Sequence, residues 1–414
     1  MVASHETQDT PFYTADAHAL LHGSYSPPLG RSDLTGLRFP PFVRHVHQRD
    51  AFRAPGYPAF LAIFGGGGGG TSRVLVLVAQ TAVVGASVFL AGLWARRLLG
   101  PELALAAAGV YAIDPYSKRY AAIVLSEALS GFLLMLVVYA LVRAWEERSV
   151  RWWAGCGVGA GVLVLVRPVF TLLLPVVLGA ALLQRAAGRI RARDAAAFTA
   201  CAALLIAPWL VRNTLVVGRP VLQGFGVGWG LLAGAHGEGL DHTYSDIVTS
   251  PGFLRDFYGV VRFAPPPARY LRDRDAHARY LYRADTYQRS RARAIYGDRL
   301  GREPWTVAWE WLYRAYFLWM AHEDWYQPGG LALLLLRLVD WVALALGAGG
   351  AVLAWRRGGP ARALAIFLVL YTAASAIGHV EARFSVPLRG IYLVFGTLAV
   401  VTLLGRRRSA VPAI

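Results

Sequence analysis

Charged and aromatic residues near the amino terminus have a spacing that could support catalysis. Asp9, Tyr13 and Ala17 stand four residues apart within the pattern D-x3-Y-x3-A-x2-L-L-x-G, so a helix would carry all three on one face. A carboxylate held in this way is a candidate for proton transfer, and Tyr13 beside it is a candidate substrate contact. Asp9 could instead be only a helix cap or a solvated acid, which is the usual role of a lone Asp in a loop.

Arginines beside proline and aromatic residues form a second set of candidates. Residues 53–58 read Arg-Ala-Pro-Gly-Tyr-Pro, and Arg212 lies in the motif P-W-x-x-R-N. A guanidinium group donates two parallel hydrogen bonds to a phosphate and stays charged near lipid. Arg53, Tyr57 and Arg212 are therefore candidates for binding an anionic substrate. The arginines could instead snorkel towards lipid headgroups, and the Pro-Trp pair could be an interfacial anchor.

Two further carboxylates belong to the same set. Glu127 lies in the outer half of an apolar stretch, where an unpaired carboxylate is costly and a functional role is the first hypothesis. Its alternative is a structural ion pair with Lys118 or Arg119. Glu381 and Arg383 stand in the motif E-A-R-F, either as a substrate-binding pair or as a local ion pair in a short loop.

The elements that must position these residues cross a membrane. More than half of the residues are apolar and only 16% are charged, which excludes an ordinary soluble globule. The net charge of +17 is divided into short arginine clusters between apolar runs, a pattern typical of topology signals and not of a nucleic-acid-binding stripe. Both cysteines lie in apolar stretches, so neither a disulfide framework nor a thiolate metal cluster is expected.

About nine apolar runs approach the length of roughly 20 helical residues that a span of about 30 Å of hydrocarbon requires. A break is expected at Arg167-Pro168, because proline disfavours helix at the residue before it and a guanidinium is costly at the bilayer centre. The expected spans are 73–95, 101–117, 119–142, 152–166, 168–184, 195–217, 331–355, 361–378 and 386–405.

The distribution of arginine gives the orientation of these spans. With the break in place, the clusters that follow residues 95, 142, 184, 355 and 405 all fall on one side, which the positive-inside rule makes the cytoplasm. The amino-terminal segment then lies outside, so we expect either a further membrane helix upstream of residue 1 or unaided translocation of this short polar segment. We expect four parts: an outer loop with the catalytic motif (1–72), a membrane helical core (73–217), a small extracytoplasmic subdomain (218–330) and C-terminal membrane helices (331–414).

Two other features are expected to carry no chemistry. The run Gly65–Gly70 is a flexible joint, because no Lys-Ser or Lys-Thr follows it as in a phosphate-binding loop. The group His236, Glu238, Asp241 and His242 has ligand-capable residue types, but its spacing fits no common zinc motif.

From Asp9 to about Pro387, the motifs and their order resemble those of bacterial membrane glycosyltransferases of the GT-C fold. This family is related to the protein O-mannosyltransferases and the lipid A aminoarabinose transferase, and is similar to glycosyltransferase family 39. The Arg-x-Pro-Gly-Tyr-Pro motif carries most of the resemblance, and the first-loop, P-W-x-x-R-N and E-x-R-[YF]-x-x-P motifs support it. Phe384 stands where the family commonly has Tyr.

The resemblance implies an all-α integral membrane protein, a GT-C multi-span helical bundle with a small extracytoplasmic subdomain. It also implies transfer of a sugar from a polyprenyl-phosphate donor to a hydroxyl of a glycan, lipid or protein acceptor, on the outer face of a bacterial inner (plasma) membrane. Asp9 would be the catalytic carboxylate, and Arg53, Arg212 and Arg383 would hold the carrier phosphate. Some relatives use a divalent metal and others do not, so no metal ligand is assigned.

Two other classes of function fit parts of the sequence. A transporter or lipid flippase would use Glu127 and Arg167 to line a path, but it needs access to both faces, whereas the charged candidates gather on one face and no inverted repeat is visible. A non-catalytic GT-C-like protein would keep the fold without the reaction. Because the inner loops are too short to fold a nucleotide-binding domain, a lipid-linked donor is favoured over a nucleotide sugar.

Overall fold

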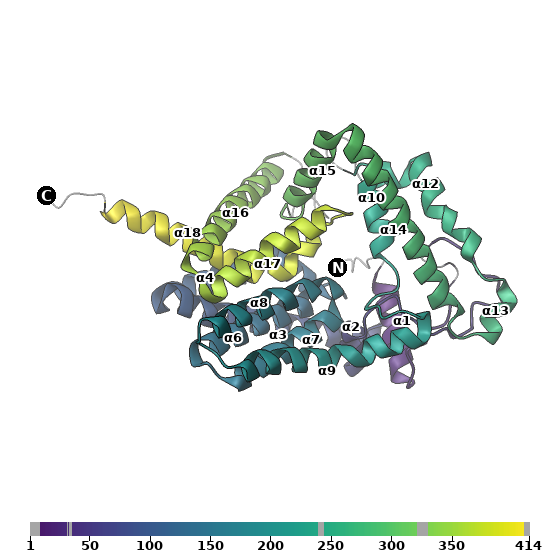
Figure 1. Cartoon of the computed structure of the whole chain (residues 1–414), viewed down its shortest axis with the longest axis horizontal. Coiled ribbons are helices and arrows are strands. Elements are labelled where there is room, and N and C mark those ends of the chain that lie inside the picture. Colours follow the sequence, from purple (N-terminus) through teal and green to yellow (C-terminus); the bar gives the residue numbers. More distant parts are fainter. Residues whose placement is uncertain (1–8, 31, 33–34, 239–243, 321–329, 410–414) are drawn as a thin grey trace.

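The computed structural model describes residues 9–30, 32, 35–238, 244–320 and 330–409, and every regular element in these ranges is a helix. The expected all-α fold is confirmed. Figure 1 shows the long helices gathered on one side of the molecule. On the other side lie α10 (Val227–Ala235), α12 (Pro251–Tyr258), α13 (Pro267–Arg272) and α14 (Ala276–Arg302), with α1 (Thr10–Leu21) and α2 (Gly56–Ile63) at the junction.

Seven helical segments are long and apolar enough to cross a membrane, which confirms a multi-pass membrane protein. Arg167 separates α7 (Val150–Val166) from the segment that begins at Pro168, as expected from the proline. The seven are α3 (Gly70–Leu99), α6 (Glu127–Glu147), η1 with α8 (Pro168–Leu172, Leu173–Ala186), α9 (Ala192–Val217), α16 (Gly330–Arg357), α17 (Gly359–Ala376), and η4 with α18 (Ala382–Leu388, Arg389–Ser409).

Seven of the expected spans are thus found as long apolar helices. Two of the expected spans are shorter apolar helices: α4 (Pro101–Ile113) rises about 20 Å and α7 (Val150–Val166) about 26 Å at roughly 1.5 Å per residue. The run expected from residue 119 is also interrupted. The Asp114 carboxylate accepts a hydrogen bond from the Ser117 backbone N–H and starts the short helix α5 (Pro115–Ala121), so α6 begins only at Glu127.

Helix α6 lies at the centre of the membrane bundle. In its apolar window 72% of the residues are buried, compared with 28% for α3 and 22% for α16, whose remaining apolar side chains face outward as lipid-facing helices do. Helix α6 packs against α3, α7, α17 and α18. Small residues allow close helix approach elsewhere in the bundle: a Cβ added to Gly157 of α7 would lie 2.3 Å from the Phe198 carbonyl oxygen of α9.

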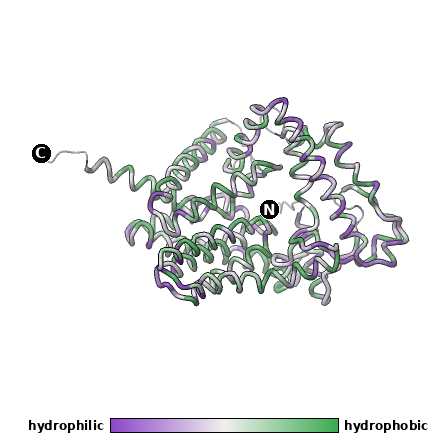
Figure 2. The backbone as a smooth tube through the Cα atoms, viewed as in Figure 1, coloured by the Kyte–Doolittle hydropathy of each residue, from purple (hydrophilic) through white to green (hydrophobic). Residues whose placement is uncertain are grey.

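The polar side of the molecule, as far as the structure describes it, is built from residues 218–238 and 244–317. Figure 2 shows more hydrophilic colouring over α13 and α14 than along the membrane bundle. The first loop binds this side, because Arg49 forms an ion pair with Asp275 at 2.5 Å and Gln48 donates a hydrogen bond to the Tyr270 carbonyl at 2.8 Å. Its helices are α10 (Val227–Ala235), α11 (Tyr244–Thr249), α12 (Pro251–Tyr258), η2 (Gly259–Phe263), α13 (Pro267–Arg272), α14 (Ala276–Arg302) and α15 (Pro304–Phe317).

Two short helices of the first segment complete the junction between the two sides. Helices α1 (Thr10–Leu21) and α2 (Gly56–Ile63) pack against each other, and α2 also packs against α7. The Thr10 hydroxyl donates a hydrogen bond to the Val124 carbonyl at 3.2 Å, which holds the start of α1 beside the turn that precedes α6. The amino-terminal motif is thereby placed over the ends of the membrane helices.

Candidate functional site

Asp9 lies between two arginines that come from distant parts of the chain. One carboxylate oxygen is 2.6 Å from Arg53 Nη2, and the other is 3.1 Å from Arg383 Nη2. Asp9 immediately precedes α1, but its side chain makes no capping hydrogen bond. The side chain is 30% exposed, whereas both arginine side chains are 11% exposed. Asp9 is therefore the most exposed of these three residues, and the two arginines are largely buried.

The two arginines keep Asp9 ionised. Burial acts to raise the pKa of Asp9, but the charges and hydrogen bonds of Arg53 and Arg383 outweigh it and hold the pKa below its usual value. At neutral pH the group is a carboxylate, which is the form that can accept a proton.

Aromatic rings hold the Arg53 guanidinium in place. Its Cζ lies 4.2 Å from the centroid of the Tyr13 ring and 4.5 Å from that of Phe52, which are cation–π distances. Arg53 Nε is buried, and it has no hydrogen-bond partner in the part of the chain that the structure describes. The guanidinium thus retains a donor for an anion in addition to the one that Asp9 accepts.

The Pro-Gly-Tyr-Pro residues after Arg53 fix this arrangement. Gly56 begins α2 so close to α7 that an added Cβ would lie 2.7 Å from the Leu165 carbonyl carbon. Tyr57 is fully buried and its hydroxyl donates a hydrogen bond of 2.6 Å to Gln80 Oε1 on α3. Its ring packs edge-on against Tyr13 at 4.8 Å, so Tyr57 positions the ring that in turn carries Arg53.

A chain of charges continues from Arg383 into the polar side of the molecule. Arg383 Nε lies 2.5 Å from Glu381 Oε2, and His379 Nε2 lies 3.4 Å from the other Glu381 oxygen. His379 Nδ1 lies 2.8 Å from Glu238 Oε1. Burial acts to lower the pKa of His379, but its hydrogen bonds to Glu238 and Glu381 outweigh burial and raise the pKa to about 9. His379 is consequently an imidazolium at neutral pH.

Glu127 and Arg167 form a second ion pair beside the first cluster. Arg167 Nη1 is 2.8 Å from Glu127 Oε1, and the Glu127 side chain is 3% exposed. The other oxygen, Oε2, is buried without a hydrogen-bond partner in the described ranges. Phe384 joins the two clusters, because Arg167 Cζ and Arg383 Cζ lie 5.5 and 5.7 Å from the centroid of its ring.

Arg212 lies apart from this cluster. Its guanidinium donates hydrogen bonds to the backbone carbonyls of Asp50 and Tyr25 and stacks over Trp209, with Cζ 4.8 Å from the ring centroid. Its donors are directed at the backbone of the first loop, which they fix to the end of α9. The structure thus brings together Asp9, Tyr13, Arg53, Glu381 and Arg383, with Glu127 adjacent and Tyr57 behind Tyr13.

Sequence reasoning missed three members of these clusters as site residues. From the sequence, Arg167 marks a turn or part of a transport path, and His379 belongs to no motif. Glu238 belongs to a group of four residues whose spacing fits no common zinc motif. The spacing of His379 two residues before Glu381 was the available signal. Asp241 and His242 of that group lie outside the described residues, and within those residues no three His, Cys, Asp or Glu side chains are placed to hold a metal ion.

Comparisons with known proteins agree with this architecture. Residues 53–211 match the family described as dolichyl-phosphate-mannose-protein mannosyltransferase. No curated protein sequence matches the chain. The structure of the oligosaccharyltransferase from Archaeoglobus fulgidus in its apo form is similar with a TM-score of 0.53 at 14% identity, over 97% of this chain and 47% of that one. The same protein in complex with zinc and sulfate gives a TM-score of 0.52 at 13% identity, over 96% and 45%.

ArnT from Cupriavidus metallidurans in the apo state is a more distant neighbour, with a TM-score of 0.38 at 13% identity, over 95% of this chain and 73% of that one. This chain spans about half the length of the oligosaccharyltransferase. The oligosaccharyltransferase comparison establishes the fold, and the family match covers the segment from Arg53 to Val211. The chain is therefore a membrane protein of the GT-C fold, with a central segment that matches the dolichyl-phosphate-mannose-protein mannosyltransferases.

Proposed function

We propose that this protein is a glycosyltransferase that moves a sugar from a polyprenyl-phosphate donor to an acceptor hydroxyl. The observation that carries the proposal is the Asp9 carboxylate held between the guanidinium groups of Arg53 and Arg383 at the ends of the membrane helices. A carboxylate and two cations in contact supply what the reaction requires, which is a proton acceptor and countercharge for a departing phosphate. The description of the matched family names a dolichyl-phosphate sugar, which supports a lipid-linked donor.

The proposed reaction is a displacement at the anomeric carbon of the sugar. The acceptor oxygen forms a bond to this carbon while the bond from the carbon to the phosphate oxygen breaks, and the electron pair leaves with the phosphate. The proton of the acceptor hydroxyl passes to Asp9, whose lowered pKa keeps it ionised until then. A second acid is not required, because a phosphate leaves without being protonated.

Arg53 and Arg383 are proposed to bind the carrier phosphate. Arg53 has a buried donor, Nε, without a partner in the described residues, and Arg383 already reaches the carboxylate beside which the phosphate must lie. Charge on the leaving phosphate grows as the bond breaks, so these cations stabilise the transition state more than the bound donor.

Glu127 is proposed to accept a hydrogen bond from a hydroxyl group of the sugar or of the acceptor. Its Oε2 atom is buried and without a partner in the described residues, while Arg167 holds the other oxygen. A buried carboxylate oxygen without a donor is costly, and a bound hydroxyl would satisfy it. Tyr13 and Glu381 are proposed to shape the same site, and Tyr57 to act through Tyr13.

The reaction is proposed to take place on the outer face of a bacterial inner membrane. Glu127 begins α6, whereas the arginines that follow residue 142 lie at its opposite end. Arg383 likewise lies at the start of the last span, whose other end leads to the arginines at 406–408. By the positive-inside rule the candidate site is then extracytoplasmic, where a polyprenyl carrier can present its sugar.

The test compares two classes of donor in membranes that contain the protein. Transfer is expected from a polyprenyl-phosphate sugar to glycan, lipid or protein acceptors, and no transfer is expected from the corresponding nucleotide sugar. Membranes containing the Asp9→Asn variant at an equal protein level serve as the matched control. Equal use of the nucleotide sugar would contradict the proposal.

A further inference from the structure

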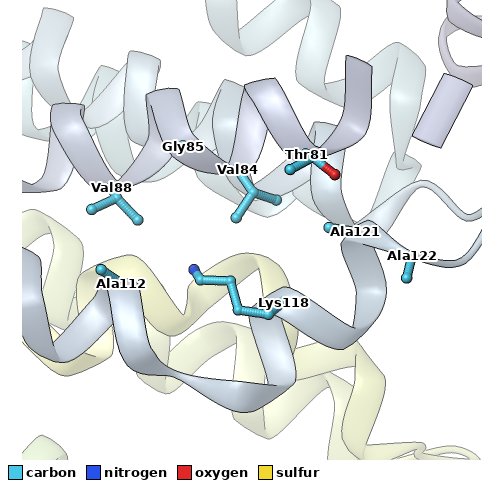
Figure 3. A pocket seen from close by; sticks show the side chains of 8 residues that line it. All are labelled: Thr81, Val84, Gly85, Val88, Ala112, Lys118, Ala121 and Ala122. Atoms are coloured by element: carbon cyan, nitrogen blue, oxygen red, sulfur yellow. The ribbon is translucent and has the colours of Figure 1, made fainter. Parts of the chain in front are cut away.

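A groove opens on the membrane-facing surface between α3, α4 and α5, away from the Asp9 cluster. Its volume is about 350 Å³, and its lining is Thr81, Val84, Gly85, Val88, Ala112, Lys118, Ala121 and Ala122. Figure 3 shows the Lys118 side chain extending into this groove between α3 and α4, towards Val84 and Ala112. Large apolar side chains are exposed beside it, including Phe89 at 66% and Ile113 at 79%, so the groove opens towards hydrocarbon.

The groove contains the only lysine of the chain. Within the described residues the Lys118 amine makes one hydrogen bond, to the Tyr111 carbonyl at 3.2 Å, lies 5.2 Å from the centroid of the Tyr111 ring, and forms no ion pair. The nearest carboxylate in the sequence, Asp114, is engaged by Arg389 at 2.6 Å and by Ser117. An ammonium group has three donors, so two remain to bind an anion in the groove. Asp114 acts on the Lys118 charge only from outside ion-pair distance and is shared with Arg389, and a cation on a membrane-facing surface is costly unless an anion accompanies it.

The floor of the groove is connected to the candidate site. Gln80 Nε2 donates hydrogen bonds to the carbonyls of Ala121 at 3.0 Å and Ile123 at 2.8 Å, while its Oε1 accepts from Tyr57. Tyr57 supports Tyr13, which carries Arg53. The same backbone segment therefore has the groove on one side and the residues that hold the candidate site on the other.

We propose that this groove is a docking site for a polyprenyl phosphate, with the Lys118 amine on its phosphate and the first isoprene units along Val84 and Val88. The apolar lining suits a hydrocarbon chain, and one ammonium group suits one monophosphate. Binding of inorganic phosphate alone would leave the apolar lining of the groove exposed. The choice of a polyprenyl carrier over a phospholipid rests on the proposed function, because the groove adjoins the residues that hold the carrier site.

The test measures binding, so it does not depend on sugar transfer. The purified full-length protein is labelled in nanodiscs with a polyprenyl phosphate that carries a photoreactive diazirine in its first isoprene unit, and labelled peptides are mapped by mass spectrometry. Labels are expected on residues 81–88 and on the segment 112–122. Excess unlabelled polyprenyl phosphate should prevent this labelling, whereas polyprenol and phosphatidylglycerol should not.

Two sets of variants distinguish loss of binding in the groove from general effects on the protein. Lys118→Gln should reduce labelling of the groove about tenfold or more, which is typical for loss of a charged hydrogen-bond donor, and Lys118→Arg should retain most of it. Arg96→Gln removes an exposed charge at the far end of α3, the helix that carries Val84 and Val88, and should change nothing. Gly85→Leu should block the groove sterically, because a Cβ there meets open space, and Gly109→Leu is its control on α4, where a Cβ also meets open space.

The outcomes also distinguish this proposal from the proposed function. Labelling of the groove that survives in an inactive Asp9→Asn variant supports the groove without reference to catalysis. Unchanged labelling in both Lys118→Gln and Gly85→Leu overturns the proposal. Equal protection by phosphatidylglycerol also overturns it, because the groove would then be a general site for anionic lipid.

Discussion

At the scale of single residues, the charged groups of the candidate site have two roles. They neutralise one another in the folded protein, and they are proposed to bind a substrate. Arg53 and Arg383 both bind Asp9, which explains why two buried cations are tolerated beside a membrane. Yet the cluster remains open, because the Asp9 side chain is 30% exposed and Arg53 Nε has no partner among the described residues. We propose that a donor phosphate joins the arginines at this open side of the cluster.

The first prediction concerns the charge of Asp9. Asp9→Asn keeps the shape of the side chain but removes its capacity to accept the proton, so we expect turnover to fall by about 100- to 10,000-fold. Donor affinity should not fall, because the substitution leaves Arg53 and Arg383 without their countercharge. Turnover and donor affinity of purified variants measure the two effects separately.

Arg53→Ala is the matching variant, since it should weaken donor binding first, by about ten- to a hundredfold. Near-normal turnover of Asp9→Asn, at unchanged protein levels, would refute the assignment, and Glu127 would become the next carboxylate to test. Because Asp9 makes no capping hydrogen bond, the variant should not lose the roughly 0.5–2 kcal/mol that a helix cap contributes.

The second prediction concerns His379 and pH. Its pKa in the folded protein is raised to about 9 from a reference value of 6.5, so its ion pairs contribute stability that is fully present below pH 6.5. This contribution is lost as the pH rises through about 9, because a neutral imidazole no longer supplies a positive charge to Glu238 and Glu381. Thermal unfolding of the detergent-purified protein should therefore move to lower temperature between pH 7 and pH 10.

His379→Gln is the control for this titration. It removes the titrating group but keeps hydrogen-bonding capacity, so the unfolding temperature of the variant should be lower at pH 7 and should change less between pH 7 and pH 10. An equally steep loss in the variant would assign the pH dependence to other groups.

At the scale of the elements, the candidate site depends on how closely helices approach. Gly56 allows α2 to begin against α7, which brings Arg53 to Asp9. Gly157 does the same between α7 and α9, because its missing side chain lets the helix touch the Phe198 carbonyl. Helix α7 ends at Val166, immediately before Arg167. The position of the Arg167–Glu127 ion pair therefore depends on the packing of α7.

The third prediction concerns this packing. A Cβ at Gly157 would lie 2.3 Å from a backbone oxygen, so Gly157→Val must push α7 and α9 apart, at a typical cost of about 1–3 kcal/mol for overpacking. Gly155→Val is the matched control on the same helix, where a Cβ meets nothing within 4 Å. Fluorescence-detected thermal unfolding in detergent should show a lower unfolding temperature for the first variant only. Equal unfolding temperatures would mean that the two helices adjust freely.

At the scale of the whole molecule, the ends of the membrane helices divide into two sets. The clusters of charge around Asp9 and Glu127 lie at one set of ends, and the short arginine-rich connections at residues 96–97, 143–151 and 185–193 lie at the other. The polar helices α10, α12, α13 and α14 lie together on one side of the molecule (Figure 1), and Glu238, which follows α10, joins them to the candidate site through His379 at 2.8 Å.

The fourth prediction tests this polarity. A reporter that is active only in the cytoplasm should be active when fused after Arg408, because the positive-inside rule predicts a cytoplasmic location for the arginine clusters. The same reporter inserted within residues 230–300 should be inactive, and a reporter that is active only outside should give the reverse result. Cytoplasmic activity from the 230–300 insertion would invert the topology and remove the proposal of an outer-face reaction.

The sequence by itself determined the membrane bundle, the break at Arg167-Pro168 and the motifs that contain the candidates. These follow from local rules, because hydrophobic length, the steric demand of proline and the spacing along one helix involve neighbouring residues only. The same rules placed the start of the span that contains Glu127 too early. They detect the apolar composition near residue 119. They do not detect that the Asp114 side chain caps a separate helix by accepting a hydrogen bond from the Ser117 backbone N–H.

Only the tertiary structure decided which candidates meet. The three arginines expected to bind phosphate are equivalent in the sequence, yet Arg53 and Arg383 reach Asp9 whereas Arg212 binds backbone carbonyls of the first loop. Glu127 pairs with Arg167, while the amine of Lys118 lies in a groove and binds Tyr111. The physical reason is that an ion pair requires its two groups to lie within about 4 Å, and packing of distant helices, not local sequence, sets that distance.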